Sequence, residues 1–163
     1  MGRTGRSVLS TGENPALTMT LLRPISQNKF RAIFKNFGWP GAETLILTQQ
    51  MRKVTLPNIK ADNTVHPGLH IEFQDEVTNG VMKLLLTQLA RQRDQLNTSE
   101  FQIDLELLDD NQKPLRTHAF SGCLLGGIVQ DPLSYEERES MGISTLASYR
   151  KFEIFDADRN KLW

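Results

Sequence analysis

The segment from Phe101 to Gly122, FQIDLELLDDNQKPLRTHAFSG, decides the fold class of this 163-residue chain. In its first half, hydrophobic and polar residues alternate, which is the period of a strand with one face in the core and the other in solvent. The polar connection at residues 109–112, DDNQ, is followed by a second extended run from Pro114 to Gly122. Two such runs joined by a tight polar turn predict an antiparallel β-hairpin.

Further strands are predicted on both sides of this hairpin. Residues 29–37 and 69–74 alternate hydrophobic and polar positions, and residues 44–56 form an extended run rich in Leu, Ile, Thr and Val. After the hairpin, glycines bracket a short apolar run that leads to a strand at residues 128–129, and a last strand is predicted over residues 148–155. The chain is therefore expected to be mainly β.

One long helix is predicted between these strands, over residues 76–96. Its hydrophobic residues fall on one stripe at helical spacing, and Asp75 is in position to cap its N-terminus. Ser134 and Glu137 have the spacing of a capping box, which predicts a short helix or turn within residues 133–142. The order of strands, one helix and strands again predicts a mainly β (α+β) fold, a β-barrel or β-sandwich with one flanking α-helix.

Length and composition predict a single domain preceded by an arm. With 39% hydrophobic and 23% charged residues, the chain is expected to fold. Residues 1–28 contain several Gly and Pro residues and no sustained period, so they are expected to form an extended N-terminal arm before a β-barrel domain at residues 29–163. No apolar stretch approaches the ~20 residues of a membrane span, so no membrane insertion of the subunit is expected.

The charges divide unevenly along the chain although they cancel overall. Residues 1–60 carry nine Lys or Arg and two acidic residues, and residues 61–163 carry ten and seventeen, which gives +7 and −7. A neutral total argues against a general nucleic-acid binder, because neutralising phosphates requires a basic surplus. Two interpretations stay open: the halves attract each other within one fold, or opposite charges on different surfaces allow copies to stack head to tail.

The residues do not assemble into a recognisable catalytic or metal site. His66 and His70 are spaced like a helical metal pair, but Pro67 and Gly68 between them break the helix. His118 and Cys123 are five residues apart with no third group to orient the imidazole, and no phosphate-binding glycine motif is present. The chain is therefore expected to be no enzyme and to bind no metal or cofactor.

A cluster of aromatic and basic residues supports one alternative from another functional class. Arg31, Phe34, Phe37 and Trp39 mix the groups that single-strand nucleic-acid platforms use. The same residues are also typical of core aromatics with exposed cations at a sheet edge. A single β-barrel binding module of the oligonucleotide-binding type therefore stays open as an alternative.

The order of these passages resembles the tail-tube proteins of contractile-tailed bacteriophages, a superfamily that also includes type VI secretion tube proteins. The resemblance spans residues 28–156 and lies in the succession of passages at a similar total length. The passages are Asn28–Ile33, Val54–Ile59, Leu69–Phe73 leading into Asp75, the helix to Leu89, Phe101–Leu108 with Pro114–Gly122, and Arg150–Phe155.

The resemblance implies a β-barrel subunit without catalytic residues that forms hexameric rings, stacked into a hollow tube inside a contractile sheath. The implied partners are further copies of the chain, the tail sheath protein, a baseplate tube initiator, a tail terminator and double-stranded DNA in transit through the lumen. The implied location is the tail of a virion, assembled in the host cytoplasm. The arm and residues 131–147 depart from the simplest family pattern, so a main tube, an initiator and a tail-end protein all stay open, as do a phage tail and a secretion or tailocin-type machine.

Two sets of residues are expected to serve assembly on this interpretation. Polar side chains on one face of the strands are expected to face the lumen, and these are Gln49, Arg52, Asp104, Glu106 and Arg116. Charged residues from the two halves, together with the terminal aromatic residue, are expected to contact neighbouring subunits. These are Arg3, Arg6, Arg23, Asp109, Asp110 and Trp163.

Overall fold

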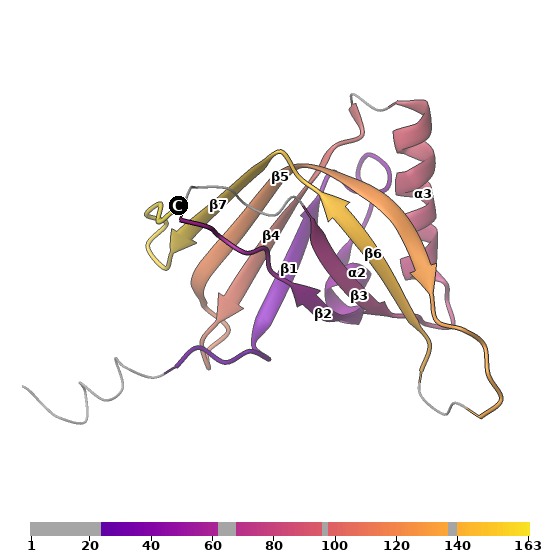
Figure 1. Ribbon diagram of the computed structural model, residues 1–163, viewed down its shortest axis with the longest axis horizontal. Coiled ribbons are helices and arrows are strands. Elements are labelled where there is room, and N and C mark those ends of the chain that lie inside the picture. Colours follow the sequence, from indigo (N-terminus) through magenta and orange to yellow (C-terminus); the bar gives the residue numbers. More distant parts are fainter. Residues whose placement is uncertain (1–23, 62–67, 96–97, 137–139) are drawn as a thin grey trace, which may run out of the picture.

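The computed structural model describes residues 24–61, 68–95, 98–136 and 140–163, and these form seven strands and two helices (Figure 1). The strands are β1 (Phe30–Lys35), β2 (Met51–Thr55), β3 (Leu69–Gln74), β4 (Phe101–Leu108), β5 (Pro114–Gln130), β6 (Gly142–Ser148) and β7 (Lys151–Asp156). The helices are α2 (Leu45–Gln50) and α3 (Gly80–Asp94). Of the predicted arm, only residues 24–28 are described, and they contain no helix or strand.

The strands form two antiparallel sheets that share β5 (Figure 1). In sheet A the order is β1, β4, β5, β7, and in sheet B it is β5, β6, β3, β2. The first half of β5 belongs to sheet A, and its second half pairs with β6 after a register irregularity between Leu125 and Ile128. A 17-residue strand thus leaves one sheet and enters the other, which is how a sandwich turns its corner.

The core lies between the two sheets, and α3 closes one side of it. Alternate positions of each strand are buried, as at Ile103 and Leu105 of β4 and Ile71 and Phe73 of β3. The described residues therefore confirm the predicted mainly β fold with a flanking helix. Helix α3 adds three hydrophobic side chains to the core: Val81, Leu84 and Leu85.

Two glutamines fix α3 to the sandwich. Gln88 is fully buried, and its side chain accepts a hydrogen bond from the Gly38 N–H (2.9 Å) and donates one to the Ser99 carbonyl (2.8 Å). The Gln92 side chain donates to the Leu125 carbonyl (2.9 Å) and accepts from the Leu125 N–H (2.8 Å). The helix is therefore attached where β5 changes from sheet A to sheet B.

The central hairpin is confirmed, with β4 and β5 paired antiparallel. The Asp109 carboxylate accepts hydrogen bonds from the Asn111 N–H (2.7 Å) and the Lys113 N–H (2.9 Å). A side chain that satisfies two turn amides stabilises the tight connection, as expected of Asp in this position.

The predicted strand at residues 44–56 is wrong in its first half. Residues 45–50 form α2, and only the five residues of β2 are extended. Helical spacing places Thr44 and Thr48 on one side, where their hydroxyl groups donate hydrogen bonds to carbonyls of β1. Tertiary contacts therefore override the β propensity of this run.

The predicted start of the long helix is also wrong. The helix begins at Gly80 rather than after Asp75, and Asn79 before it has a positive φ of 60°. Glu76 takes over the capping role, because its carboxylate accepts hydrogen bonds from the N–H groups of Thr78 (2.8 Å) and Val81 (3.1 Å). Val77, predicted to lie on the buried stripe, is 98% exposed.

The region after β5 differs most from the prediction. Neither residues 133–136 nor residues 140–142 contain a helix, and the Ser134 hydroxyl accepts a hydrogen bond from the Glu136 N–H (3.2 Å). Glu137, the other member of the predicted capping box, lies outside the described residues. Strand β6 was not predicted, because GISTLAS mixes small and polar residues, and the last strand begins at Lys151, three residues after its predicted start.

Candidate assembly interface

The five predicted lumen residues lie on more than one surface of the described chain. Gln49 is exposed on α2, and Arg52 is exposed on β2. Asp104 and Glu106 occupy the solvent face of sheet A, whereas Arg116 lies on its inner face opposite Leu107. Alternation along a strand gives two faces, and only the partner strands decide which face is inside.

The two predicted acidic lumen residues are already paired within sheet A. Glu106 accepts bonds from two guanidinium nitrogens of Arg31, at 2.8 and 2.7 Å. Asp104 accepts a bond from Lys35 at 2.9 Å. These ion pairs connect β1 to β4 and neutralise the solvent face of this sheet.

The predicted contact residues that the structure describes have partners within their own chain. Arg3, Arg6 and Arg23 lie outside the described residues. Asp110 forms an ion pair with Lys29, next to the turn that Asp109 stabilises. Trp163 is half-buried, and its backbone pairs with Ile154 of β7.

Sheet A has both of its edges covered. At β1, the hydroxyl groups of Thr44 and Thr48 donate to the Phe34 carbonyl (3.2 Å) and the Ala32 carbonyl (2.5 Å). Lys29 forms a hydrogen-bonded pair with Leu108, so the backbone groups of residues 32 and 34 point away from β4. Helix α2 therefore occupies the edge where another strand would otherwise pair.

The chain's C-terminal residues cover the opposite edge of sheet A. The Ile154 N–H donates to the Trp163 carbonyl (3.2 Å), and the Asp156 N–H donates to the Asn160 carbonyl (2.9 Å). A further bridge joins Phe155 to Lys161. Figure 1 shows this C-terminal segment beside β7.

Sheet B, in contrast, is open among the described residues along the outer edge of β2 and along β5 after Leu125, the residue whose backbone Gln92 binds. No hydrogen bond of the described loops and turns reaches the outer edge of β2. At the other edge, Asp131 donates to the Gly142 carbonyl (3.2 Å), so the register places the N–H of Gln130 on the side away from β6. Unpaired backbone groups on an edge strand are a template for another strand, so sheet B is the part of the fold suited to pairing between chains.

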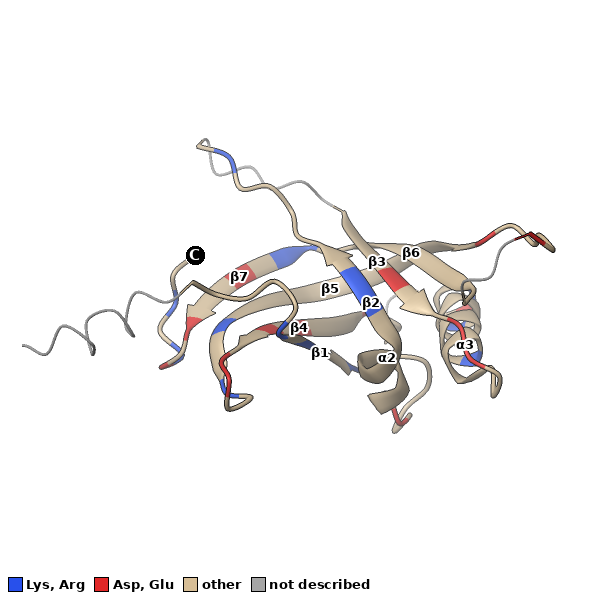
Figure 2. Ribbon diagram, turned by 90° about the horizontal axis from the view of Figure 1, so that it is seen from below, with Lys and Arg blue, Asp and Glu red and all other residues tan. Residues whose placement is uncertain are grey.

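The solvent face of sheet B is mixed in charge. Lys53 of β2 lies opposite Glu72 of β3, and Thr55 lies opposite His70. Figure 2 shows basic positions of β2 beside an acidic position of β3. The rest of this face carries small polar residues of β6 and two exposed hydrophobic residues, Leu146 and Val129.

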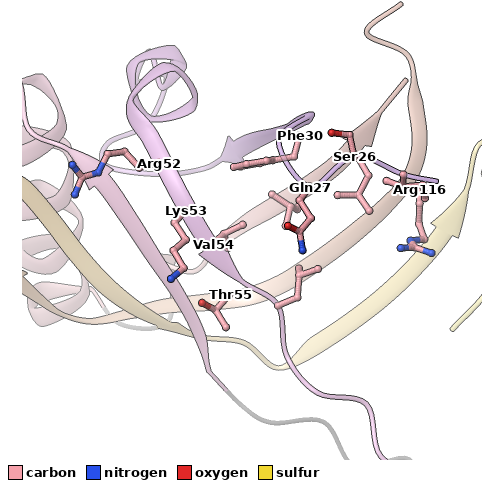
Figure 3. Close-up of a pocket in the computed structure, with 12 residues that line it drawn as sticks. Ser26, Gln27, Phe30, Arg52, Lys53, Val54, Thr55 and Arg116 are labelled. Carbon is pink, nitrogen blue, oxygen red and sulfur yellow. The ribbon is translucent and has the colours of Figure 1, made fainter. Parts of the chain in front are cut away.

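A cavity of about 600 Å³ opens between the two sheets. It lies beside β1 and β2, the outer strands of the two sheets, which do not pair with each other. Its lining comes from β1, β2, β4, β5 and residues 25–27. Figure 3 shows Phe30, Gln27 and Val54 in this space, with Lys53 on one side and Arg116 on the other.

The buried polar groups near this cavity are short of partners. His118 is buried two residues after Arg116, and neither of its ring nitrogens has a hydrogen-bond partner, nor does Arg116 Nε. Burial, with the adjacent Arg116 charge, lowers the pKa of His118 to about 4, so the ring is neutral near pH 7.

Burial also raises the pKa of Cys123 to about 12, which keeps this thiol unreactive.

The described residues contain no group of three or more His, Cys, Asp or Glu side chains that could hold a metal ion. His66 of the predicted pair lies outside the described residues. Neither described helix has the length and apolar character to cross a bilayer.

No protein-family model matches this sequence, and no curated protein sequence matches it significantly. Solved structures do match its fold. A chain of the PVC sheath–tube complex, from an extracellular contractile injection system in the extended state, is 7% identical, with 88% of this chain and 99% of that chain covered and a TM-score of 0.60.

Two chains of the anti-feeding prophage match in the same way. One belongs to the baseplate in a six-fold symmetrised structure, at 13% identity, coverage of 83% and 97%, and a TM-score of 0.56. The other belongs to the cap that terminates the tube, at 9% identity, coverage of 82% and 92%, and a TM-score of 0.55. The two sheets that share β5, together with these matches over nearly the full length of the other chains, show that this protein shares the fold of these chains from contractile injection systems and the anti-feeding prophage.

Proposed function

We propose that the protein is a structural subunit that closes into hexameric rings through sheet B, and that these rings stack into the inner tube of a contractile tail or injection machine. The observation that carries the proposal is the contrast between the two sheets. Sheet A has its edges covered by α2 and by the C-terminal residues, whereas among the described residues β2 and the part of β5 after Leu125, where the contact with Gln92 ends, leave theirs open. Pairing β2 of one copy with β5 of the next removes both open edges at once.

The direction of the strands supports this closure. Neighbouring strands of sheet B are all antiparallel, so β5 and β2 run in opposite directions. A copy rotated about a ring axis keeps its orientation and therefore brings its β5 antiparallel to the β2 of its neighbour. Each interface uses two different edges, and such heterologous contacts close into a ring when the rotation allows it.

The ring changes the assignment of the lumen. The inner face of sheet B is covered by the core, so its solvent face is the surface that a closed barrel turns toward its axis. On this proposal the wall carries Lys53, Thr55, His70 and Glu72, rather than Asp104 and Glu106 of sheet A. A wall in which Lys53 and Glu72 lie side by side gives a polyanion such as DNA little to bind to, and supports passage rather than retention.

The remaining partners follow from the proposed tube. The tail sheath protein would surround it, an initiator in the baseplate would begin it, and a terminator would end it, in a particle assembled in the host cytoplasm. The PVC tube complex, the prophage baseplate and the prophage cap all contain chains of this fold, which supports a structural and non-enzymatic role. We place the protein in the tube itself, because its two open edges suit a repeating subunit.

The edge pairing is tested by replacing Gln130 with proline. The N–H that this removes points away from β6, so the subunit is expected to keep its melting temperature within a few degrees. Ring formation is expected to weaken by at least about tenfold per interface, because a carbonyl of the neighbouring β2 loses its donor and the proline ring obstructs its approach. Light scattering across a concentration series measures this change.

Gln130→Ala serves as the matched control, since it retains the N–H and should assemble like the original protein. If Gln130→Pro forms rings at the same concentration as Gln130→Ala, sheet B does not close the ring by its edges.

A further inference from the structure

The cavity between the sheets has a charge without a counter-charge. Its lining includes Arg52, Lys53 and Arg116 and no acidic residue, and of these Lys53 lies on the solvent face of β2, opposite Glu72. Arg116 takes part in none of the ion pairs or hydrogen bonds of the described residues, and its Nε is buried without a partner. A buried guanidinium nitrogen without an acceptor is costly, so the cavity is suited to an occupant that brings a carboxylate.

Much of the remaining lining of the cavity is apolar and is therefore suited to contact with apolar atoms. Phe30, Val54, Leu56, Leu105 and Leu107 are the apolar residues that β1, β4 and the β2 segment contribute to the lining. An occupant that combines a large hydrophobic side chain with a nearby carboxylate therefore matches both parts of the cavity.

Among the described residues, two segments combine a hydrophobic side chain that is more than 80% exposed with a neighbouring carboxylate. The first is the turn at residues 75–79, where Val77 is 98% exposed, but the Glu76 carboxylate there is engaged by Thr78 and Val81. The second is the loop after β5, residues 131–136, which we term the DPLSYE loop.

The DPLSYE loop offers both kinds of group in a free state. Leu133 is 87% exposed and Tyr135 is fully exposed, so neither side chain packs on its own chain. The Glu136 side chain accepts no hydrogen bond and forms no ion pair among the described residues. Large side chains held in solvent next to a free carboxylate are typical of a docking segment.

The loop lies at one end of sheet B, and the cavity reaches the other end. Gln130, just before the loop, pairs through Ile143 and Phe73 with Met51 at the start of β2. The cavity extends along β2 from Arg52, which also lines a smaller cavity with Asp131–Ser134 of its own chain, to Thr55 and Leu56 at the other end. A contact that joins opposite ends of two copies is head to tail, and it can repeat without limit along a stack.

We propose that the DPLSYE loop of one copy inserts Leu133 and Tyr135 into the cavity of a second copy, where the Glu136 carboxylate pairs with Arg116. The proposal rests on the proposed tube function, for which it supplies a contact between one ring and the next. It also gives the excess of acidic residues in residues 61–163 a role in the head-to-tail stacking that the charge distribution allows.

The contact is tested by cysteine cross-linking between two variants of the full chain. Tyr135→Cys and Thr55→Cys are mixed at high concentration with a mild oxidant, and the cross-linked pair is measured on a non-reducing gel. Cys123 is buried and its pKa is raised to about 12, so it contributes little background. Val77→Cys mixed with Thr55→Cys is the matched control, because residue 77 is equally exposed.

We expect several times more cross-linking for the 135/55 pair than for the 77/55 pair. Adding Glu136→Arg to the Tyr135→Cys chain is expected to reduce it about tenfold, the effect of losing a charge-assisted hydrogen bond. In electron micrographs, Glu136→Arg alone should leave separate rings and few tubes.

Three results would overturn the contact. One is stacked rings in which both pairs cross-link equally, and another is tubes of normal length formed by Glu136→Arg. The third is stronger cross-linking of Thr55→Cys to Ser10→Cys, which would make the N-terminal arm the occupant. Each of these leaves the rings in place, whereas a chain that forms neither rings nor cross-links contradicts the proposed function as well.

Discussion

Replacing Gln88 with leucine is expected to lower the free energy of unfolding by about 4 kcal/mol. The leucine fits the buried volume but makes no hydrogen bonds, so the Gly38 N–H and the Ser99 carbonyl lose their partner. Each buried group left without a partner costs about 1–3 kcal/mol. The loss is large because Gln88 is fully buried and water cannot replace the amide.

Chemical denaturation of the variant, monitored by circular dichroism, measures this change. Gln95→Leu is the matched control, since Gln95 is exposed at the C-terminal end of α3 and its replacement should change stability by less than about 0.5 kcal/mol. A loss below about 1 kcal/mol for Gln88→Leu would show that the glutamine does not hold α3 on the sandwich.

The second large effect is the dependence of stability on pH through His118. Burial lowers the pKa of His118 from 6.5 to about 4, so the unfolded chain takes up the proton first as the pH falls. The free energy of unfolding is therefore expected to decrease from about pH 6.5 and to level off below about pH 4. At about 1.4 kcal/mol for each pKa unit, His118 accounts for about 3 kcal/mol of this loss.

A comparison with His118→Phe isolates this contribution, because carboxylates titrate in the same range in both proteins. The stability difference between the original protein and the variant should shift by about 3 kcal/mol between pH 7 and pH 4, in favour of the variant at low pH. His70→Phe is the matched control, because it removes an imidazole from the exposed face of β3. Parallel stability curves for His118→Phe and the original protein would contradict this, because they would mean that the His118 ring takes up its proton as readily in the folded chain as in the unfolded chain.

The parts of the fold that the sequence predicted are those in which one face of an element is buried. In β3 and β4 the alternation of hydrophobic and polar residues matches the observed burial, and the Asp109 turn contains the residue that its hydrogen bonds require. Local patterns suffice there because core and solvent lie on opposite sides of the same element.

The parts that it did not predict depend on contacts distant in sequence. The run LILTQQ has β propensity, but it forms α2. The hydroxyl groups of Thr44, just before this helix, and of Thr48 within it donate hydrogen bonds to two carbonyls of β1. β5 continues through Gly126 and Gly127 because Gln92 of α3 binds the backbone at Leu125, where the strand leaves sheet A. Neither partner can be identified from the spacing of residues within the strand itself.

The assembly residues were the least predictable for a related reason. A polar side chain on a strand faces outward in every register, so Asp104 was chosen for the lumen although Lys35 already neutralises it. Which sheet has open edges depends on where α2 and the C-terminal residues fold back. One signal is present in the sequence itself: Leu133 and Tyr135 are large hydrophobic residues in a short segment that also contains acidic residues. Both side chains are exposed, so neither is needed for the core.

The most direct test of this account is the mass and shape of the purified full chain, by light scattering combined with negative-stain electron microscopy. The account predicts particles of six subunits of 18.5 kDa that appear as rings of uniform diameter, and hollow tubes of the same diameter as the concentration rises. A folded protein that stays at 18.5 kDa over the whole concentration range, both alone and with added preformed tube ends, would contradict it.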